Sequence, residues 1–127
     1  MIYFISGHRD ITEAEFQQEY ARKILLLAYK DTDVNFVVGD CIGVDATAQT
    51  LLSDLVSRGV IPYSHVKVYH MFTAPRHNVG SFRTVGGFKS DDERDSAMTN
   101  ASDEDIAWVR PGREGSGTHK NILRRTS

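Results

Sequence analysis

The stretch MIYFISGHRDITEAEF, residues 1–16, contains in order the features of a strand, a turn and the start of a helix. Residues 2–5 are apolar and favour β-structure, which predicts a strand that is covered on both faces. Thr12 and Glu15 have the spacing of a capping box, in which each side chain bonds the backbone N–H of the other residue. The apolar positions that follow fall on one helical face, so the helix is expected to continue to about Tyr29 with that face on a sheet.

The alternation of strands and helices continues along the rest of the chain. The sequence predicts further short buried strands at 35–38, 66–71 and 105–109, and further helices beginning near Val44, after Ser90 and at Gly117. The stretch 73–88 holds one Pro and three Gly residues and is expected to be irregular. Strands that alternate with helices form parallel sheets. The expected fold class is therefore α/β, a Rossmann-like three-layer α/β/α domain with a mainly parallel sheet of about four strands.

The composition fits a single domain spanning residues 1–127. Of the residues, 40% are hydrophobic and 25% are charged, which is enough for one core. With 15 basic and 17 acidic residues the net charge is −2, so no global positive field attracts nucleic acid. The single cysteine, Cys41, excludes an internal disulfide and a zinc site built from cysteines, and it fits a reducing compartment.

No stretch of the sequence is apolar for long enough to predict a signal peptide or a membrane-spanning helix. A soluble, cytoplasmic protein with no membrane partner is therefore expected. The histidines His8, His70 and His77 do not share the spacing of a metal site. Neither a metal nor a cofactor is predicted.

Three of the expected strands end in turns rich in glycine, hydroxyl and charged residues. Ligands of parallel α/β folds bind at the carboxyl ends of the strands, so these turns mark the expected site. Glycine permits a close approach to a ligand, and the N–H groups of a following helix favour an anion. The ligand-binding residues expected from the turns are Ser6, Gly7, His8, Arg9, Gly39, Asp40, Gly43, Asp45, Gly112, Arg113, Gly115, Ser116, Gly117 and Thr118.

The last of these turns, residues 111–118, is a candidate phosphate cradle, with hydroxyls from Ser116 and Thr118 and charge from Arg113. Taken alone, it is equally an ordinary strand-to-helix turn capped by Ser or Thr. Three such turns on one edge favour phosphate or another anionic ligand. The turn at 39–43 has no G-x-G-x-x-G, and Thr118 stands where a P-loop has lysine. Neither a dinucleotide cofactor nor an NTPase is therefore indicated.

Several motifs, in chain order, resemble one group of proteins. The segments ERDSAM (93–98), SDEDIAWVRPG (102–112) and GSGT (115–118) resemble the paired R-x-x-x-M and P-G-G-x-G-T signature of the SLOG superfamily. The segments GDCIGVDA (39–46) and SGHRD (6–10) resemble the G-G-x-x-G-A-D-A and S-G-x-R-D blocks of its YspA-like branch. The superfamily also includes DprA-like proteins and the "Lonely Guy" phosphoribohydrolases, and small chains of this kind are similar to proteins of phage genomes.

The resemblance implies a Rossmann-like domain that binds a nucleotide or a nucleotide derivative. It matches the glycines and Thr118 of the 112–118 turn to the phosphate loop, and Arg94 to the signature arginine. The position of the phosphoribohydrolases' catalytic Glu holds Asn121, and an amide can neither accept a proton nor place negative charge beside an oxocarbenium ion. The chain is therefore expected to bind rather than to cleave, although the question of an enzyme stays open.

Substitute carboxylates are present around Arg94. Asp45, Glu93, Asp95 and Glu114 are candidates for an acid, a base or a nucleophile, with Arg94 beside them. The alternative is structural. The first three carboxylates stand in first turns of helices, where they favour the helix dipole, and Glu114 is solvated.

Arg76, His77 and Arg83 lie in the stretch that is expected to be irregular. They are candidates for a lid that closes over an anionic ligand. The alternative is an ordinary surface loop.

Functions from different classes fit these observations. The first is a module that senses or sequesters a nucleotide-like small molecule, and the second is a hydrolase or transferase acting on the N-glycosidic bond of nucleoside monophosphates. A DprA-like contact with single-stranded DNA is a third interpretation, which the net charge disfavours. A four-stranded sheet leaves one edge with little cover, which predicts a homo-oligomer, in its simplest form a dimer.

Overall fold

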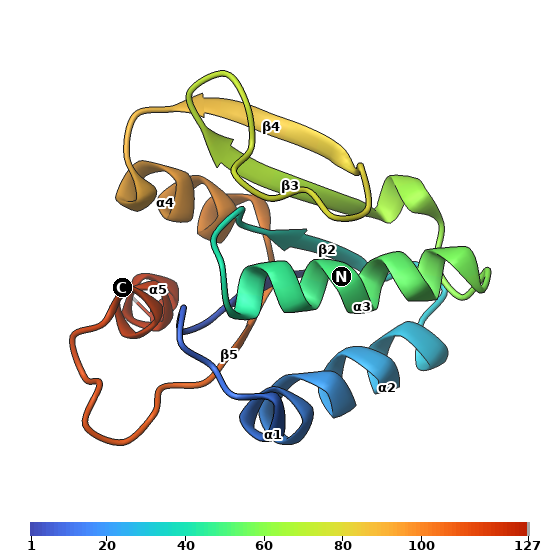
Figure 1. Ribbon diagram of the computed structural model, residues 1–127, viewed down its shortest axis with the longest axis horizontal. Helices are drawn as coiled ribbons and strands as arrows, with labels where there is room; N and C mark the ends of the chain where they lie inside the picture. Colours follow the sequence, from blue (N-terminus) through green and yellow to red (C-terminus); the bar gives the residue numbers. More distant parts are fainter. Residues whose placement is uncertain (127) are drawn as a thin grey trace.

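Within residues 1–126, which the computed structural model describes, five strands form one parallel sheet in the order β4-β3-β2-β1-β5 (Figure 1). The strands are β1 (Ile2–Ser6), β2 (Asn35–Val38), β3 (Val66–Met71), β4 (Arg83–Phe88) and β5 (Glu104–Ala107). The order runs outward from β1 to β4 and then returns to the other side of β1 with β5. The reversal lies between β1 and β5, and ligands bind at such reversals in sheets of this type.

Helices cover both faces of this sheet (Figure 1). One face carries α1 (Glu13–Phe16), the π-helical turn η1 (Gln17–Ala21), α2 (Arg22–Lys30) and α3 (Val44–Ser57), and the other carries α4 (Asp91–Ala101) and α5 (Gly117–Thr126). A 3-10 turn, η2 (Tyr63–His65), precedes β3. The expected Rossmann-like α/β/α arrangement is therefore confirmed. None of the helices in the described part of the chain has both the length and the apolar character needed to cross a membrane.

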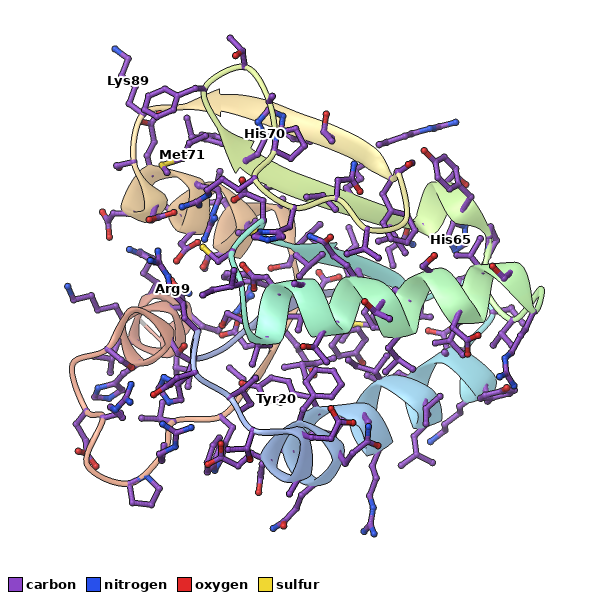
Figure 2. All side chains as sticks on the ribbon, viewed as in Figure 1. Arg9, Tyr20, His65, His70, Met71 and Lys89 are labelled. Atoms are coloured by element: carbon purple, nitrogen blue, oxygen red, sulfur yellow. The ribbon has the colours of Figure 1, made fainter. Side chains whose placement is uncertain are left out.

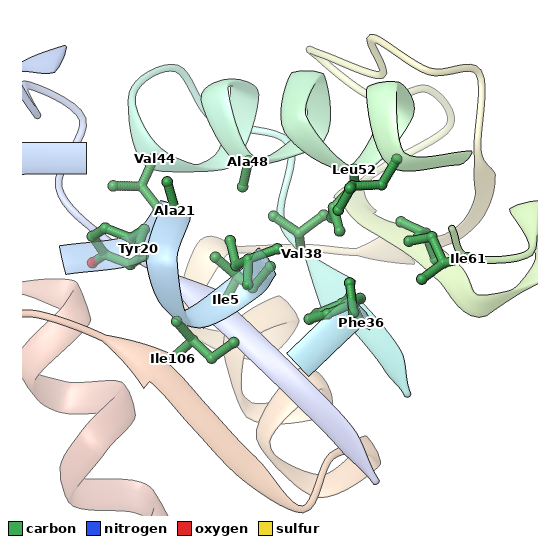
Figure 3. Packing of buried hydrophobic residues seen from close by; sticks show 14 of the residues in the cluster. Ile5, Tyr20, Ala21, Phe36, Val38, Val44, Ala48, Leu52, Ile61 and Ile106 are labelled. Carbon is green, nitrogen blue, oxygen red and sulfur yellow. The ribbon is translucent and has the colours of Figure 1, made fainter. Parts of the chain in front are cut away.

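Two hydrophobic clusters lie on opposite sides of the sheet. Ile5 of β1 and Val38 of β2 are paired across the strands and pack in the cluster that contains Leu52 of α3 (Figure 3). The residue before Ile5, Phe4, belongs to a second cluster with Met98 of α4. Successive side chains of a strand point to opposite faces, so both faces of the central strands are covered, as the continuous apolar run 2–5 predicts.

The number of strands differs from the expected four. Residues 83–88 form β4, so the expectation that all of 73–88 is irregular is wrong for this segment. β4 lies parallel to β3 at the edge of the sheet. Gly86 is a loop signal in the sequence, but a Cβ at this position would lie 2.2 Å from Cε1 of the buried His70 ring. The glycine therefore lets β4 pass close to β3 over that ring.

The first long helix contains the π-helical turn within it. Its start has the expected capping box: Glu15 N donates to Thr12 Oγ1 at 3.1 Å, and Thr12 N donates to Glu15 Oε1 at 2.9 Å. The π-turn contains Tyr20, whose ring is fully buried. Its hydroxyl donates to the Ser6 carbonyl oxygen at 2.8 Å and accepts from Trp108 N at 3.0 Å. The phenol thus links the ends of β1 and β5, and π-turns of this kind frequently occur at functional sites.

Candidate functional site

A pocket of about 410 Å³ opens beyond the carboxyl end of β1, between α4 and α5. Small-molecule sites commonly have volumes of about 300 to 1,000 Å³. The walls come from the residues at and after β1, the start of α3, one side of α4 and the start of α5. The lining residues are Phe4, Ser6, Gly7, His8, Arg9, Asp10, Cys41, Asp45, Asp91, Arg94, Asp95, Met98, Arg113, Gly117, Thr118 and Asn121.

Many of the residues expected from the sequence meet in this pocket. Those that line it are Ser6, Gly7, His8, Arg9, Asp45, Arg94, Asp95, Arg113, Gly117 and Thr118. Others stand behind the walls or in the turn that leads to α5, namely Gly39, Asp40, Gly43, Gly112, Gly115 and Ser116. Two candidate carboxylates do not line the pocket: Glu93 accepts a hydrogen bond from Lys89 N at 3.2 Å, and Glu114 is exposed.

Some lining residues are not among those expected from the sequence. Asp10 and Asp91 line the mouth of the pocket, and Cys41 lines its wall. Asp10 follows Arg9 in the turn after β1, so the charged residues of that turn were the feature of the sequence that could have identified it. Asp91 stands in the first turn of α4, where an acid is explained by the helix dipole. Its contact with Arg9 joins residues 82 positions apart, and no local pattern predicts it.

Asp40 holds two arginines behind the pocket wall. Its carboxylate is 1% exposed and accepts hydrogen bonds from Arg94 Nη1 at 2.6 Å and from Arg76 Nη2 at 2.9 Å. Burial by itself raises the pKa of Asp40, but the hydrogen bonds of Arg76 and the charges of both arginines hold it below its usual range. Asp40 is therefore an ionised carboxylate whose oxygens are occupied by the protein.

The three candidate lid residues do not line the pocket. Arg76 is held by Asp40, and His77 Nδ1 lies 3.1 Å from the Asp40 carbonyl oxygen. Gln49 of α3 donates to the His77 carbonyl oxygen at 3.0 Å and so holds the same loop against α3. Arg83 begins β4 and therefore lies at the amino end of the parallel sheet, opposite the pocket. The loop before β4 packs on the turn after β2 instead of covering the site.

Arg94 separates this network from the pocket. Its guanidinium is 5% exposed and donates to Asp95 Oδ1 through Nε at 3.1 Å and Nη2 at 2.9 Å. Burial lowers the pKa of Arg94, but the charges of Asp95 and Asp45 raise it above its usual value. Asn121 Nδ2 donates to the second oxygen of Asp95 at 3.1 Å. Asn121, at the position matched to a catalytic Glu, thus orients a neighbouring carboxylate.

Asp45 is a buried acid of the pocket wall. Its Oδ2 accepts a hydrogen bond from Cys41 N at 3.1 Å. Burial raises the pKa of Asp45 to about 7, although the charge of Arg94 and the bond from Cys41 act in the opposite direction. A Cβ at Gly39 would lie 2.5 Å from Asp45 Oδ2 and 2.9 Å from Arg94 Cζ. Glycine at this position therefore allows both groups to approach the end of β2.

Ser6 brings an unsatisfied hydroxyl to the pocket. The residue is 5% exposed and lines the pocket, and its Oγ has no hydrogen-bond partner among the residues described. Its carbonyl oxygen is already bonded to the Tyr20 hydroxyl. A buried polar group without a partner costs about 1 to 3 kcal/mol, and most such groups are paired in folded proteins. Side chains alternate along β1, so the Ser6 side chain points to the same face as that of Phe4, which also lines the pocket.

His8 is held as a neutral ring beside the same pocket. Its Nε2 accepts a hydrogen bond from Arg110 N at 2.9 Å, which assigns the ring proton to Nδ1. Burial lowers the pKa of His8, and the charges of Arg110 and Arg113 lower it further. The backbone of His8 also contacts the turn after β2, because Val44 N donates to the His8 carbonyl oxygen at 3.2 Å. The turns after β1 and β2 are thus joined.

The mouth of the pocket carries cations and the start of a helix. Arg9, which is labelled in Figure 2, pairs with Asp91 at 3.2 Å beside the first turn of α4. Arg113 pairs with Asp10 at 2.5 Å. The side chains of both arginines are well exposed, at 60% and 44%, and exposed ion pairs are weak enough to exchange partners. Residues 117–118 begin α5, where N–H groups have no acceptor within the helix. Cations and a helix N-terminus together favour an anion.

The turn before α5 is closed mainly by its own hydrogen bonds. Gly112 and Gly115 have φ of +89° and +91°, which favours glycine at both positions. Gly115 N donates to His119 Nδ1 at 2.8 Å, and Ser116 Oγ accepts from His119 N at 3.2 Å. Among the residues of the expected phosphate turn, Arg113, Gly117 and Thr118 are the ones that line the pocket.

In the part of the chain that the structure describes, no three His, Cys, Asp or Glu side chains are grouped so that they could hold a metal ion. Comparisons of the chain with models of protein families, with curated proteins and with solved structures gave no match. The chemistry of the site is therefore inferred from its own geometry.

Proposed function

We propose that this chain binds a nucleotide or a nucleotide-derived small molecule in the pocket beyond β1. One observation carries the proposal: a single pocket of about 410 Å³ combines a helix N-terminus and exchangeable arginines with a buried Ser6 hydroxyl that has no partner among the described residues. The helix N-terminus and the arginines suit a phosphate, and the Ser6 hydroxyl suits a neutral polar group. The position of the pocket beside the reversal of strand order supports the same proposal.

The phosphate binds at the start of α5 in this proposal. It accepts hydrogen bonds from the N–H groups of Gly117 and Thr118 and takes its countercharge from Arg113 and Arg9. Each arginine then exchanges its aspartate partner for the phosphate, so both guanidinium groups keep a negatively charged partner. The Thr118 hydroxyl is a further donor, because this residue is buried and lines the pocket.

The SLOG-like motifs support the proposal through their position. Arg94 comes from one motif and Gly117 and Thr118 from another, and all three line one pocket with Ser6 to Arg9 of the first turn. Asn121 supports binding over turnover, because the matched position supplies an amide that hydrogen-bonds Asp95. We therefore propose that the protein senses or sequesters its ligand.

A second candidate function is cleavage of the N-glycosidic bond of a nucleoside monophosphate. The observation in its favour is that Asp45 and Asp95 both line the pocket beside Arg94, with the pKa of Asp45 raised to about 7 by burial. An acid with such a pKa is suited to proton transfer near neutral pH. Incubation with nucleoside monophosphates, followed by chromatography for free base, separates the two functions. Release of free base by the wild type that is lost in Asp45→Asn and Asp95→Asn supports cleavage. A wild type that releases no free base supports binding alone.

Isothermal titration calorimetry with nucleosides and their 5′-monophosphates tests the main proposal. The monophosphates are expected to bind at least about tenfold more tightly than the nucleosides, a difference of about 1.4 kcal/mol. Equal affinities for nucleosides and monophosphates contradict the phosphate position. Absence of binding heat for every compound at millimolar concentration contradicts the proposed function.

A further inference from the structure

We propose that the deep end of the pocket is a hydroxyl-recognising subsite, so that the site selects its ligand by the ribose of a ribose 5-phosphate group and not by the base. This inference rests on the proposed function and adds the part of the nucleotide that is recognised. It is carried by Ser6 and Asp45, by the separation of charge within the pocket, and by the small aromatic content of its described lining.

The Ser6 hydroxyl is the first element of the subsite. It is buried without a partner in the described chain, while the backbone of the same residue is fixed by Tyr20. A serine hydroxyl donates one hydrogen bond and accepts others. Its best partner is therefore a group that can do the same, and a sugar hydroxyl meets this requirement.

Asp45 is the second element. It lines the same pocket, and one of its oxygens accepts from Cys41 N. A hydroxyl can donate to this carboxyl group when it is ionised and can accept from it when it is protonated. A hydroxyl is thus bound in either protonation state, whereas a pure acceptor is bound only by the protonated form. Two neighbouring ribose hydroxyls can satisfy Ser6 and Asp45 together.

The charges of the pocket set the orientation of the ligand. The carboxyl groups of Asp45 and Asp95 lie in the inner wall with Arg94, whose donors are directed to Asp95 and Asp40. A phosphate placed there would face carboxylates without a free cation. At the mouth, by contrast, Arg9 and Arg113 accompany the start of α5. The phosphate therefore stays at the mouth, and the sugar points inward.

The described lining of the pocket gives a base little aromatic surface to stack on. Base recognition commonly uses aromatic faces. Apart from the His8 imidazole, the lining contains one aromatic ring, that of Phe4, which is 0% exposed and packed with Met98 in the core. Trp108 does not line the pocket. The base is therefore left at the opening, and its identity contributes little to affinity.

Calorimetry with four probes tests this inference: adenosine 5′-monophosphate, its 2′-deoxy form, ribose 5-phosphate and inorganic phosphate. We expect ribose 5-phosphate to bind within about tenfold of the nucleotide, and the 2′-deoxy nucleotide to bind at least about tenfold more weakly than the nucleotide. Ser6→Ala is expected to weaken ribose 5-phosphate about tenfold and to leave inorganic phosphate unchanged.

Thr99→Val is the matched control for Ser6→Ala. Thr99 Oγ1 is the other buried side-chain atom without a partner among the residues described, and Thr99 does not line the pocket. The control is expected to leave the affinity for ribose 5-phosphate unchanged. Asp45→Asn gives an independent check, because it keeps an acceptor for Cys41 N while changing the group that faces the sugar.

The outcomes separate this inference from the function on which it rests. Equal affinities for the nucleotide and its 2′-deoxy form, or an unchanged affinity of Ser6→Ala for ribose 5-phosphate, overturn the sugar subsite and leave nucleotide binding intact. Absence of binding by all four probes overturns the proposed function itself. A loss of affinity in Thr99→Val equal to that in Ser6→Ala also overturns the subsite, because it shows a general structural effect.

Discussion

The hydroxyl of Tyr20 donates a hydrogen bond of 2.8 Å to the carbonyl oxygen of Ser6, the last residue of β1. It also accepts one of 3.0 Å from Trp108 N, just after β5. The π-turn of the first helix thereby fixes the two strand ends between which the strand order reverses. The side-chain hydroxyl of Ser6 has no hydrogen-bond partner among the described residues. The site thus depends on a helix packed on the opposite face from α4 and α5.

Tyr20→Phe is expected to lower the free energy of unfolding by about 1 to 3 kcal/mol, because it leaves the Ser6 carbonyl and the Trp108 N–H without their shared partner. Urea denaturation measures this change. Tyr29→Phe is the control, since Tyr29 is 65% exposed. Equal stabilities of the two variants would show that the phenol does not tie the strands together.

Gly39→Ala is expected to destabilise the fold and to weaken nucleotide binding. The added Cβ would lie 2.5 Å from Asp45 Oδ2 and 2.9 Å from Arg94 Cζ, so one of these groups must move. Overpacking of this kind costs about 1 to 3 kcal/mol. At Gly117, a Cβ would meet no described atom within 4 Å, so Gly117→Ala is the control for stability. Thermal unfolding of the two variants should differ clearly, and equal melting temperatures speak against the close packing behind the pocket.

Asp45→Asn is expected to remove a pH dependence of stability. The folded pKa of Asp45 is raised from 3.8 to about 7 by burial, so the folded state binds this proton more tightly than the unfolded state. The stability from this group is complete below pH 4 and is lost as the pH rises through about 7. The rise in pKa corresponds to at most about 4 kcal/mol.

Urea unfolding of the wild type and of Asp45→Asn between pH 4 and pH 8 measures that loss, because the other titrating groups cancel in the difference between the two proteins. The wild type should lose stability relative to the variant as the pH rises. A difference in stability that is the same at every pH rules out the titration of a buried Asp45.

Gly117→Asp is expected to reduce the affinity for nucleoside monophosphates by at least about a hundredfold, since it places a carboxylate where the phosphate binds. Gly117→Asn has nearly the same shape without the charge and should keep most of the affinity. Both variants should fold, because a Cβ at this position has open space around it among the described residues. Equal affinities of the Asp and Asn variants would show that the phosphate does not bind at the start of α5.

The elements that local chemistry determines were predictable from the sequence. The run at 2–5 predicts a doubly covered strand, and Thr12 with Glu15 predicts the start of the first helix. Apolar spacing does not reveal the π-turn around Tyr20, because the buried positions 16, 20, 24 and 28 are four residues apart and fit an uninterrupted α-helix. β4 was not predicted because Gly86 suggests a loop. In the structure glycine is needed at this position because the His70 ring leaves no room for a Cβ.

The candidate site was predictable as three turns at one sheet edge, because parallel strands bring their carboxyl ends together. The sequence does not predict which of those residues line the pocket and which are bound by other side chains. Asp40 and Asp45 belong to the same turn region, yet Asp40 is occupied by Arg94 and Arg76, and Asp45 lines the pocket. Contacts over 54 and 36 positions decide this difference, and local patterns do not contain them.

An amide NMR titration of the wild-type protein with adenosine 5′-monophosphate tests the central claim most directly, because it locates the ligand as well as detecting it. The claim predicts saturable shifts for the amides of Ser6, Gly117 and Thr118, and unchanged signals for the outer face of α2 at Leu26 and for Arg83 at the amino end of β4. A spectrum that does not change at millimolar nucleotide, or that changes at Leu26 or Arg83 without Gly117 and Thr118, contradicts it.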